Sequence, residues 1–568
     1  MRAIGLLPLY CVVVVHAQDL RWSELLTVQM AGNDILLGGS ASNTDGRLAI
    51  AGGFSISASI GSQTLTKSPP GGSDGYLFVI DSTGTLLWYK QFHGQRVICG
   101  RPEVDAVGNV YISVEFTAGA TYSFNGGSAG TQSWSYRYAV IKFDPLGNLV
   151  QRTVISVPNL EWPDHFGPVK MVASPSGELC VTGTFSTGTA LTVNGPENSL
   201  TVTAPGGGNE PFPFILKLQA SGDPAWGHAF GDGHDLFFRA LDTDDAGNTY
   251  IAADLRDAPG LDLDPTSNVL TPDIGGGQDG VLFKFGPTGA FLWAKQLDAN
   301  GSFLNMRALT CVPGHIYLAG DFSGQADLDP GSAVHLFSSA HHYDGFVLAL
   351  DADGGFQQAH QLSGINDQQC TWVGVNAQGD LYGAGVFNDT LLFDGLHTSL
   401  TASDYQYFLL KLTPAGQLPW LATLPGASYQ QPFPPPDPSF ASGGSPFFYA
   451  LIPITATTDV DLGPGVHLVS PVQGSMVWAL IQYGSAAIVG CMDPGSMNYT
   501  PTAVVDNGTC THPGCTDPAA LNFSPTANWN DGSCHYLDPA CRSDLNADGV
   551  VNVIDFGIFV SEFNTSCP

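Results

Sequence analysis

The sequence predicts an all-β fold, because one pattern of strands and turns recurs along most of the chain. Each copy has an apolar strand, a turn with glycine, and a second strand that tryptophan often opens, as in Tyr76–Asp81 followed by Gly84–Trp88. The six copies are centred on Gly84, Gly147, Gly222, Gly289, Gly354 and Gly416. A recurring period of this kind is typical of repeat architectures, in which each unit buries its apolar face against its neighbours.

A β-hairpin precedes each of these copies. Its turn combines Asn or Asp with Gly, as in Asp244–Asn248, and such residues tolerate the positive φ that a tight hairpin turn requires. An aromatic or leucine residue ends each hairpin at intervals of 62 to 70 residues, at Phe54, Phe116, Phe185, Leu255, Phe322 and Phe387. Four strands in each interval are typical of one blade of a β-propeller.

A seventh copy is incomplete. Phe447–Ile452 and Met476–Ile481 supply two strands, but no outer strand follows Tyr483. The missing strand is expected at the other end of the chain, where Gln18–Trp22 places a tryptophan as in the other copies. Pairing it with the last copy would remove an exposed sheet edge. The sequence therefore predicts a seven-bladed β-propeller over residues 18–488, closed by its N-terminal strand.

The N-terminus predicts secretion. Arg2 is followed by the apolar run Ile4–Val15 and by Ala17, so residues 1–17 are expected to be a signal peptide cleaved after Ala17. The run is too short for a transmembrane helix, and no second apolar stretch is long enough to cross a membrane. We expect a secreted protein that is extracellular or held at a cell surface by partners.

The charge balance narrows the class of partner. The chain has 19 Lys and Arg residues against 51 Asp and Glu residues, a net charge of −32. Nucleic acids and anionic membranes need a positive surface, so they are not expected as partners, whereas divalent cations are compatible.

Ten cysteines follow the predicted signal peptide, and six of them lie in the last 78 residues. Residues 489–537 contain two copies of a short repeat, each with two cysteines 19 positions apart. Repeats this small need a covalent link to fold, so we expect the disulfides Cys491–Cys510 and Cys515–Cys534, each contributing roughly 3 kcal/mol. The cysteines of the propeller region are expected to be free: Cys99, Cys180, Cys311 and Cys370.

The final segment, residues 538–568, carries a calcium-binding pattern of the EF-hand type. Residues with side-chain oxygen atoms occupy loop positions 1, 3, 5, 9 and 12. Position 7 supplies a backbone carbonyl, and Gly549 occupies position 6. The predicted ligands are Asp544, Asn546, Asp548, Val550, Asn552 and Asp555. Position 12 is Asp where Glu is usual, and extracellular loops of this class bind calcium with dissociation constants on the order of 10⁻⁴ to 10⁻³ M. An Asx-rich turn without a metal is the alternative.

The repeat resembles the β-propeller repeat family of secreted bacterial proteins, over residues 40 to 483. The likeness is carried by the Asp-Gly strand starts, a lysine-containing strand and the glycine-then-tryptophan strand. It implies a secreted propeller, usually of unassigned function. Two loops look like that family's aspartate-proline loop, and their paired carboxylates could hold a cation at a blade rim: Asp262 with Asp264, and Asp327 with Asp329.

The tail resembles one half of a type I dockerin, the calcium module that docks a protein to a cohesin. The resemblance implies a cohesin-like partner for the tail. Dockerins normally have two such loops and this chain has one, so stabilisation of the C-terminus is the alternative role of the loop. A disulfide between Cys541 and Cys567 could replace the support of the second loop.

No catalytic constellation is evident. The elbow-like Gly126–Gly130 lies in a Gly/Ser-rich loop, His341 and His342 have no spaced third ligand, and the recurring tryptophans suit packing between blades. The first hypothesis is a non-catalytic scaffold that binds a polysaccharide or a protein, with the calcium tail for attachment. A carbohydrate-active hydrolase or lyase with its site in the channel is the second, and an adhesin or matrix protein the third. The Pro-rich segment at 430–438 is a candidate contact loop.

Overall fold

A computed structural model describes most of residues 19–485 and parts of the C-terminal segment. The described ranges are 19–29, 36–67, 72–93, 97–116, 123–124, 137–156, 170–185, 190–203, 212–231, 236–256, 261–265, 270–271, 276–376, 379–429, 439–441, 447–454, 458–459, 467–470, 476–484, 489–490, 496, 505–506, 510–520, 522–536, 546, 550, 552–554 and 556. The chain divides into two compact parts, Met1–Ser485 and Ala486–Pro568.

The N-terminal part is all-β, as the sequence predicted. The antiparallel pairings group its described strands into seven successive repeats with four strand positions each, of which β8 and β9 share one, and hydrogen bonds join repeats 4, 5 and 6 in one 12-stranded sheet. Repeat 1 contains β2 (Leu36–Ser42), β3 (Leu48–Phe54), β6 (Asp74–Ile80) and β7 (Leu86–His93). Repeat 2 contains β8 (Val97–Cys99) with β9 (Glu103–Val104), β10 (Val110–Phe116), β12 (Arg137–Phe143) and β13 (Leu149–Ser156). Repeat 3 contains β14 (Lys170–Ala173), β15 (Leu179–Phe185), β18 (Phe212–Leu218) and β19 (Pro224–Ala229).

The remaining repeats follow the same order. Repeat 4 contains β20 (Leu236–Thr243), β21 (Thr249–Arg256), β22 (Gln278–Phe285) and β23 (Phe291–Leu297). Repeat 5 contains β24 (Phe303–Val312), β25 (His315–Asp327), β26 (Leu336–Asp351) and β27 (Phe356–Ser363). Repeat 6 contains β28 (Gln368–Val375), β29 (Leu381–Phe393), β30 (Leu396–Leu412) and β31 (Trp420–Tyr429). Repeat 7 contains β32 (Ser439–Ala441), β33 (Phe447–Ile454), β36 (Met476–Gly484) and β1 (Asp19–Gln29).

Short strands extend or flank these repeats. They are β4 (Ser57–Ile60), β5 (Gln63–Thr66), β11 (Ser123–Phe124), β16 (Ala190–Asn194), β17 (Ser199–Thr203), β34 (Thr458–Asp459) and β35 (Leu468–Val469). In the C-terminal part the described strands are β37 (Val489–Gly490), β38 (Val505–Asp506), β39 (Pro513–Gly514) and β40 (Trp529–Asn530). No helix of the described residues is long and apolar enough to cross a membrane.

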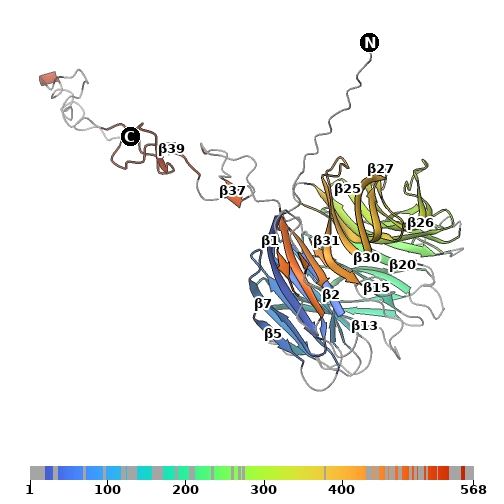
Figure 1. Cartoon of the computed structure of the whole chain (residues 1–568). Coiled ribbons are helices and arrows are strands. Elements are labelled where there is room, and N and C mark those ends of the chain that lie inside the picture. Colours follow the sequence, from blue (N-terminus) through green and yellow to red (C-terminus); the bar gives the residue numbers. More distant parts are fainter. Residues whose placement is uncertain are drawn as a thin grey trace, which may run out of the picture. The chain divides into compact units, whose positions relative to one another are not determined.

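The seventh repeat takes its outer strand from the N-terminus, as the sequence predicted. Strand β1 pairs with β36 in antiparallel register, with Leu26 opposite Trp478 and Ser23 opposite Ile481. Figure 1 shows this blue strand beside the orange strands from the far end of the same part. Residues more than 450 positions apart in the sequence therefore belong to one sheet.

The apolar core is divided between consecutive repeats. Seven clusters of buried residues are present in the described chain, each shared by two successive repeats, and the seventh joins repeat 7 to repeat 1. Strand β3 explains how one sheet serves two clusters: Leu48 and Ile50 belong to the cluster with repeat 7, while Ala49 and Ala51 belong to the cluster with repeat 2. Successive side chains of a strand point to opposite faces, so both faces are covered.

The glycine turns connect neighbouring repeats through the tryptophans. Gly289 has a φ of 84° in the turn of repeat 4, and the indole of Trp226 in repeat 3 lies directly against it. The Trp226 Nε1–H donates to the Pro287 carbonyl at 3.0 Å, and Trp88 donates to the Pro145 carbonyl at 3.1 Å in the same way. Trp226 and Trp88 therefore pack between repeats, as expected from the sequence.

This contact predicts a difference between two glycine substitutions. Gly289 and Gly314 have nearly the same φ, 84° and 83°, but a Cβ on Gly289 would lie 2.7 Å from Trp226, whereas a Cβ on Gly314 would have no atom within 4 Å. We expect Gly314→Ala to lower the free energy of unfolding by about 1 kcal/mol through backbone strain alone. Gly289→Ala should lower it by about 2 to 4 kcal/mol, because overpacking adds to the strain. Chemical denaturation of both variants measures the difference, and equal losses would contradict the packing role of Trp226.

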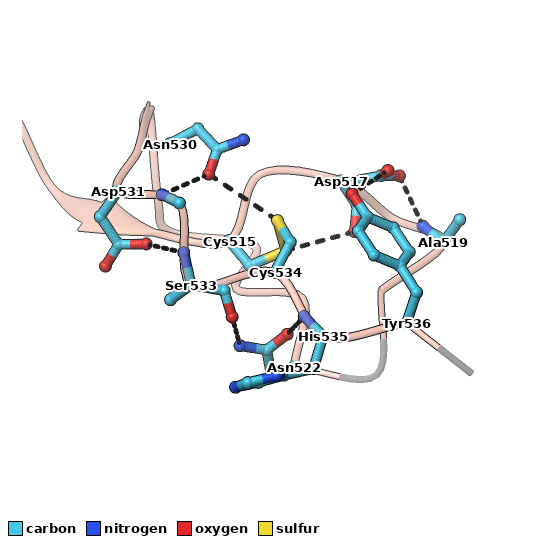
Figure 2. Close-up of a disulfide and its surroundings, with 11 residues drawn as sticks. Cys515, Asp517, Ala519, Asn522, Asn530, Asp531, Ser533, Cys534, His535 and Tyr536 are labelled. Atoms are coloured by element: carbon cyan, nitrogen blue, oxygen red, sulfur yellow. Dashed lines mark hydrogen bonds between the residues drawn. A yellow bond between two sulfur atoms is a disulfide. The ribbon is translucent and has the colours of Figure 1, made fainter. Parts of the chain in front are cut away.

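The C-terminal part contains the predicted disulfide between Cys515 and Cys534 (Figure 2). Around it, the Tyr536 hydroxyl donates to Asp517 at 2.8 Å, and the Asn522 side chain joins the backbone of Ser533 and His535. Cys510 is also disulfide-bonded, and its predicted partner Cys491 lies outside the described residues. Among the described residues from 510 to 536, only Cys515 and Ala520 are buried, so this module has almost no apolar core.

Candidate functional site

The first strands of the repeats lie beside one another. Strand β2 contacts β9, β9 contacts β14, β14 contacts β20, β20 contacts β24, and β24 contacts β28, while β32 contacts β2. Side chains on these strands can therefore form one cluster although they come from distant parts of the sequence. Eight charged residues on the first strands of repeats 2 to 5, or bonded to them, are called here the first-strand cluster: Arg101, Glu103, Lys170, Arg239, Asp242, Asp254, Arg307 and Asp321.

Basic residues recur on these strands with the period of the repeat. Arg101, Lys170, Arg239 and Arg307 follow one another at intervals of 69, 69 and 68 residues. Arg239 and Arg307 are the extra residues of β-bulges, because the strand register shifts between Phe238 and Ala240 and at the same place in repeat 5. A bulge redirects the side chain of its extra residue and is often found beside functional sites.

Two of these arginines are held by buried carboxylates of the second strand. The Arg239 Nε–H donates to Asp254 at 2.5 Å, and Arg307 forms the equivalent ion pair with Asp321. The side chains of the two aspartates are 1% and 0% exposed, whereas those of Arg239 and Arg307 are 40% and 32% exposed. Burial raises the pKa of both carboxyl groups, and the adjacent arginine opposes this shift in each case. Both arginine side chains are therefore partly exposed, while a buried carboxylate holds each of them at Nε.

Hydrogen bonds connect the cluster across repeats 3, 4 and 5. The second oxygen of Asp254 accepts the Met306 backbone N–H at 2.8 Å, and Asp242 accepts the Cys311 backbone N–H at 2.7 Å. Lys170 donates to the Arg239 carbonyl, which ties repeat 3 to repeat 4. The backbone that carries the cluster is thus fixed at several points.

Glu103 and Asp242 form the second feature of the cluster. They occupy the same register position in repeats 2 and 4, each opposite a tyrosine of the second strand, Tyr111 and Tyr250. Burial raises the pKa of Glu103 from 4.5 to about 7, with Arg101 lowering it and Asp242 raising it further. Burial also raises the pKa of Asp242, to about 6, against hydrogen bonds from Cys311 and Thr243. Part of this pair is therefore protonated near neutral pH.

The Glu103 shift makes stability depend on pH. When the pKa of a carboxyl group is higher in the folded than in the unfolded protein, the group stabilises the fold at pH values below its unfolded pKa. This contribution is lost as the pH rises through its folded pKa. For Glu103 this contribution is lost between pH 4.5 and about 7. We expect Glu103→Gln to be more stable than the parent protein at pH 8, by on the order of 2 kcal/mol, with the difference vanishing near pH 4.5. Thermal melts between pH 4.5 and 8 test this, and a parallel offset at every pH would contradict it.

The motif residues that recur in the repeat have structural partners instead. The aspartates of the Asp-Gly strand starts are buried and accept a bond from a glutamine on the fourth strand: Gln91 to Asp74 at 2.8 Å, Gln296 to Asp279 at 2.9 Å and Gln361 to Asp344 at 2.6 Å. Third-strand lysines reach the turn of the next repeat, as Lys217 does to the Gly247 carbonyl at 2.9 Å and Lys284 to the Ala352 carbonyl at 2.8 Å. These residues join strands and repeats.

The carboxylates of the two predicted blade-rim cation sites take part in hydrogen bonds within their own loops. In both loops the first aspartate, Asp262 or Asp327, accepts backbone N–H bonds from residues two and eight positions later, at 3.0 and 2.9 Å. The second aspartates are Asp264 and Asp329, and the latter also contacts His335 at 3.0 Å. Within the described ranges, no three His, Cys, Asp or Glu side chains come together to hold a metal ion.

Several other predicted residues lie outside the described part of the chain. These are Asp544, Asp548 and Asp555 of the calcium loop, Cys541, Cys567, the signal peptide, Gly126–Gly130 and residues 430–438. Of the calcium loop, Asn552 is described, and its side chain accepts the Ile554 N–H at 2.8 Å and donates to the Val550 carbonyl at 3.2 Å. The four cysteines expected to be free are free: Cys99, Cys180, Cys311 and Cys370.

None of the cluster residues was predicted as a site from the sequence. One signal was present, the return of a basic residue every 68 or 69 positions in a chain with few Lys and Arg residues. The carboxyl groups gave no comparable signal, because their importance depends on strand register and burial.

Comparison with known proteins does not identify the chain. No family model matches it, and no curated protein matches it. Among solved structures, it is similar to a protein of unknown function from Bacteroides caccae, with 11% sequence identity and a TM-score of 0.30. That alignment covers 71% of this chain and 93% of the other.

Proposed function

We propose that this chain is a secreted, seven-bladed β-propeller that binds an extracellular polysaccharide or a surface protein through the first-strand cluster. Its C-terminal segment would bind calcium and attach the propeller to another component. The calcium ligands proposed at Asp544 to Asp555 are all oxygen donors, the chemistry that calcium prefers.

Three features support the propeller. The described strands form seven four-stranded repeats, each pair of consecutive repeats shares an apolar cluster, and the last repeat shares one with the first. Strand β1 completes repeat 7. Four-stranded sheets that pack face to face in a cyclic order have the connectivity of a closed propeller.

The observation that supports binding is the partial exposure of three cluster arginines, two of which are held by buried carboxylates. The Asp-Gly aspartates are buried and bonded within their repeats, and Lys217 and Lys284 are bonded to the next repeat, whereas the side chains of Arg101, Arg239 and Arg307 are 47%, 40% and 32% exposed. A few convergent polar groups on a rigid scaffold are typical of a ligand site.

Binding of the full-length protein to immobilised polysaccharides, with and without EDTA, tests this proposal. We expect saturable binding to some polysaccharides without release of new reducing ends. Arg101→Ala should weaken it about tenfold, the loss expected for one charge-assisted hydrogen bond. Arg152→Ala, which removes an exposed arginine from strand β13 of the same repeat, should leave it unchanged. Binding to no polysaccharide would contradict the polysaccharide form of the proposal.

The Glu103 and Asp242 pair favours a second candidate function, a hydrolase or lyase acting on a polysaccharide. A carboxyl group that is partly protonated near neutral pH, beside a second carboxyl group, can act as a general acid. In that case the protein would release reducing ends or unsaturated products, and Glu103→Gln would abolish turnover while binding persisted. Binding without turnover would exclude this candidate for the polysaccharides tested.

A further inference from the structure

We propose that the first-strand cluster binds an anionic polysaccharide, with carboxylate or sulfate groups of the sugar held by Arg101, Arg239 and Arg307. This inference rests on the proposed binding function and adds the chemical class of the ligand.

The distribution of basic residues is the first argument. The chain has only 19 Lys and Arg residues against 51 acidic ones, yet four successive repeats each place one on or beside the first strand. The fold does not require a cation at the bulge of the first strand, because the bulge residue is Gly38 in repeat 1 and Thr371 in repeat 6. The basic residues of repeats 2 to 5 are therefore not required by the fold.

A comparison within the same chain supports this. The third-strand lysines Lys217 and Lys284 also recur with the repeat, but they are buried and bonded to a carbonyl of the next repeat. The three arginines are instead about one third to one half exposed. The chain thus uses one set of cations to join repeats and presents another set to solvent.

The arginines are also preorganised. Arg239 and Arg307 each contact their aspartate through Nε, which fixes the plane of the guanidinium group. The terminal nitrogens of an arginine form a fork that matches the two oxygens of a carboxylate or sulfate. Because the side chains are already ordered by Asp254 and Asp321, less conformational entropy is lost when a ligand binds.

The carboxyl groups of the cluster do not cancel this attraction. Asp254 and Asp321 are almost fully buried behind the arginines that they hold, so a ligand meets the guanidinium groups first. Glu103 and Asp242 carry less negative charge near neutral pH than exposed carboxylates do, because burial favours their protonated forms.

The neighbouring polar groups favour a sugar over an acidic peptide. The Asn305 side chain donates to Asp321 at 2.7 Å, and the Tyr405 hydroxyl donates to Asp367 at 2.8 Å. Asp321 and Asp367 interact electrostatically, so these groups belong to the edge of the same cluster. Mixed donors and acceptors suit hydroxyl groups, which both donate and accept hydrogen bonds.

Matched pairs of probes test the inference with the full-length protein. Polygalacturonate is compared with its methyl-esterified form, and dextran sulfate with dextran, while polyglutamate represents an acidic peptide. We expect at least tenfold tighter binding to one of the two anionic polysaccharides than to its neutral counterpart, and at least tenfold weakening between 0.05 and 0.5 M NaCl because salt screens exposed charges.

Variants locate the site. Arg101→Gln and Arg239→Gln should each weaken binding to the preferred anionic probe about tenfold, and Arg239→Lys should recover part of the loss. Lys295→Gln, a charge-matched change on strand β23 of repeat 4, should have no effect. Thermal melts show whether each variant is folded. If Arg239→Gln does not fold, Arg101→Gln alone tests the site.

The outcomes separate the two proposals. Equal binding to anionic and neutral polysaccharides overturns this inference and leaves the proposed function standing. Equal affinity for polyglutamate overturns the assignment to sugars, and an anionic preference that survives both arginine variants overturns the assignment to this cluster. Binding to none of the polysaccharides overturns the inference together with the polysaccharide form of the proposed function.

Discussion

Replacing Leu26 with alanine should lower the free energy of unfolding by about 2 to 5 kcal/mol, the usual cost of a cavity in a core. Leu26 lies on strand β1 and is fully buried in the cluster that repeat 7 shares with repeat 1, where it joins Ile50 and Leu480. No local contact of an N-terminal strand would produce so large an effect. Urea denaturation of the full-length protein measures the change.

Leu292→Ala provides the control for this substitution. Leu292 lies on the fourth strand of repeat 4 but is 49% exposed, so its loss should cost less than about 0.5 kcal/mol. If Leu26→Ala cost no more than Leu292→Ala, the N-terminal strand would not contribute to the core between the last and first repeats.

Removing the Cys515–Cys534 disulfide should unfold its module while the N-terminal part remains folded. The closed loop spans 19 positions, which corresponds to roughly 3 kcal/mol of stability. The buried residues described in this module are too few to replace that contribution. The double variant Cys515→Ser, Cys534→Ser should therefore be cleaved rapidly by chymotrypsin at Phe523, Trp529 and Tyr536, which resist cleavage in the parent protein.

A free cysteine serves as the comparison. Cys370→Ser alters a buried thiol of repeat 6 and should change the melting of the N-terminal part without changing cleavage between 510 and 536. Slow cleavage of the double variant would mean that hydrogen bonds such as Tyr536 to Asp517 suffice to fold the module.

The sequence was most informative where local chemistry determines structure. The glycine turns, the tryptophan packing and the pairing of the N-terminal strand with Met476–Ile481 follow from turn preferences and from a repeated pattern, and all are present. The all-β class follows from the same pattern. The free thiols follow from the places of the cysteines in different repeats, which hold Cys99 and Cys370 apart.

The candidate site was not predicted because it depends on how strands that are distant in the sequence pair and pack. Glu103 and Asp242 are 139 residues apart and become equivalent only when their strands are paired with Tyr111 and Tyr250. The bulges at Arg239 and Arg307 each shift the inward and outward alternation by one residue, from Leu304 and Met306 to Leu309 in repeat 5, and a short strand does not show from sequence alone which residue is the extra one. In the loops of Asp262 and Asp327, one oxygen of the first aspartate accepts backbone hydrogen bonds, and the cation sites predicted there stay predictions.

Amide hydrogen exchange of strand β1 tests the central claim, that the N-terminal strand closes a cycle of seven repeats. Peptides covering 19–29 and 476–484 should be protected as strongly as 86–93, the fourth strand of repeat 1. Deleting residues 19–29 should then expose 476–484. Exchange of 19–29 within seconds, with 476–484 protected in both proteins, would contradict the account.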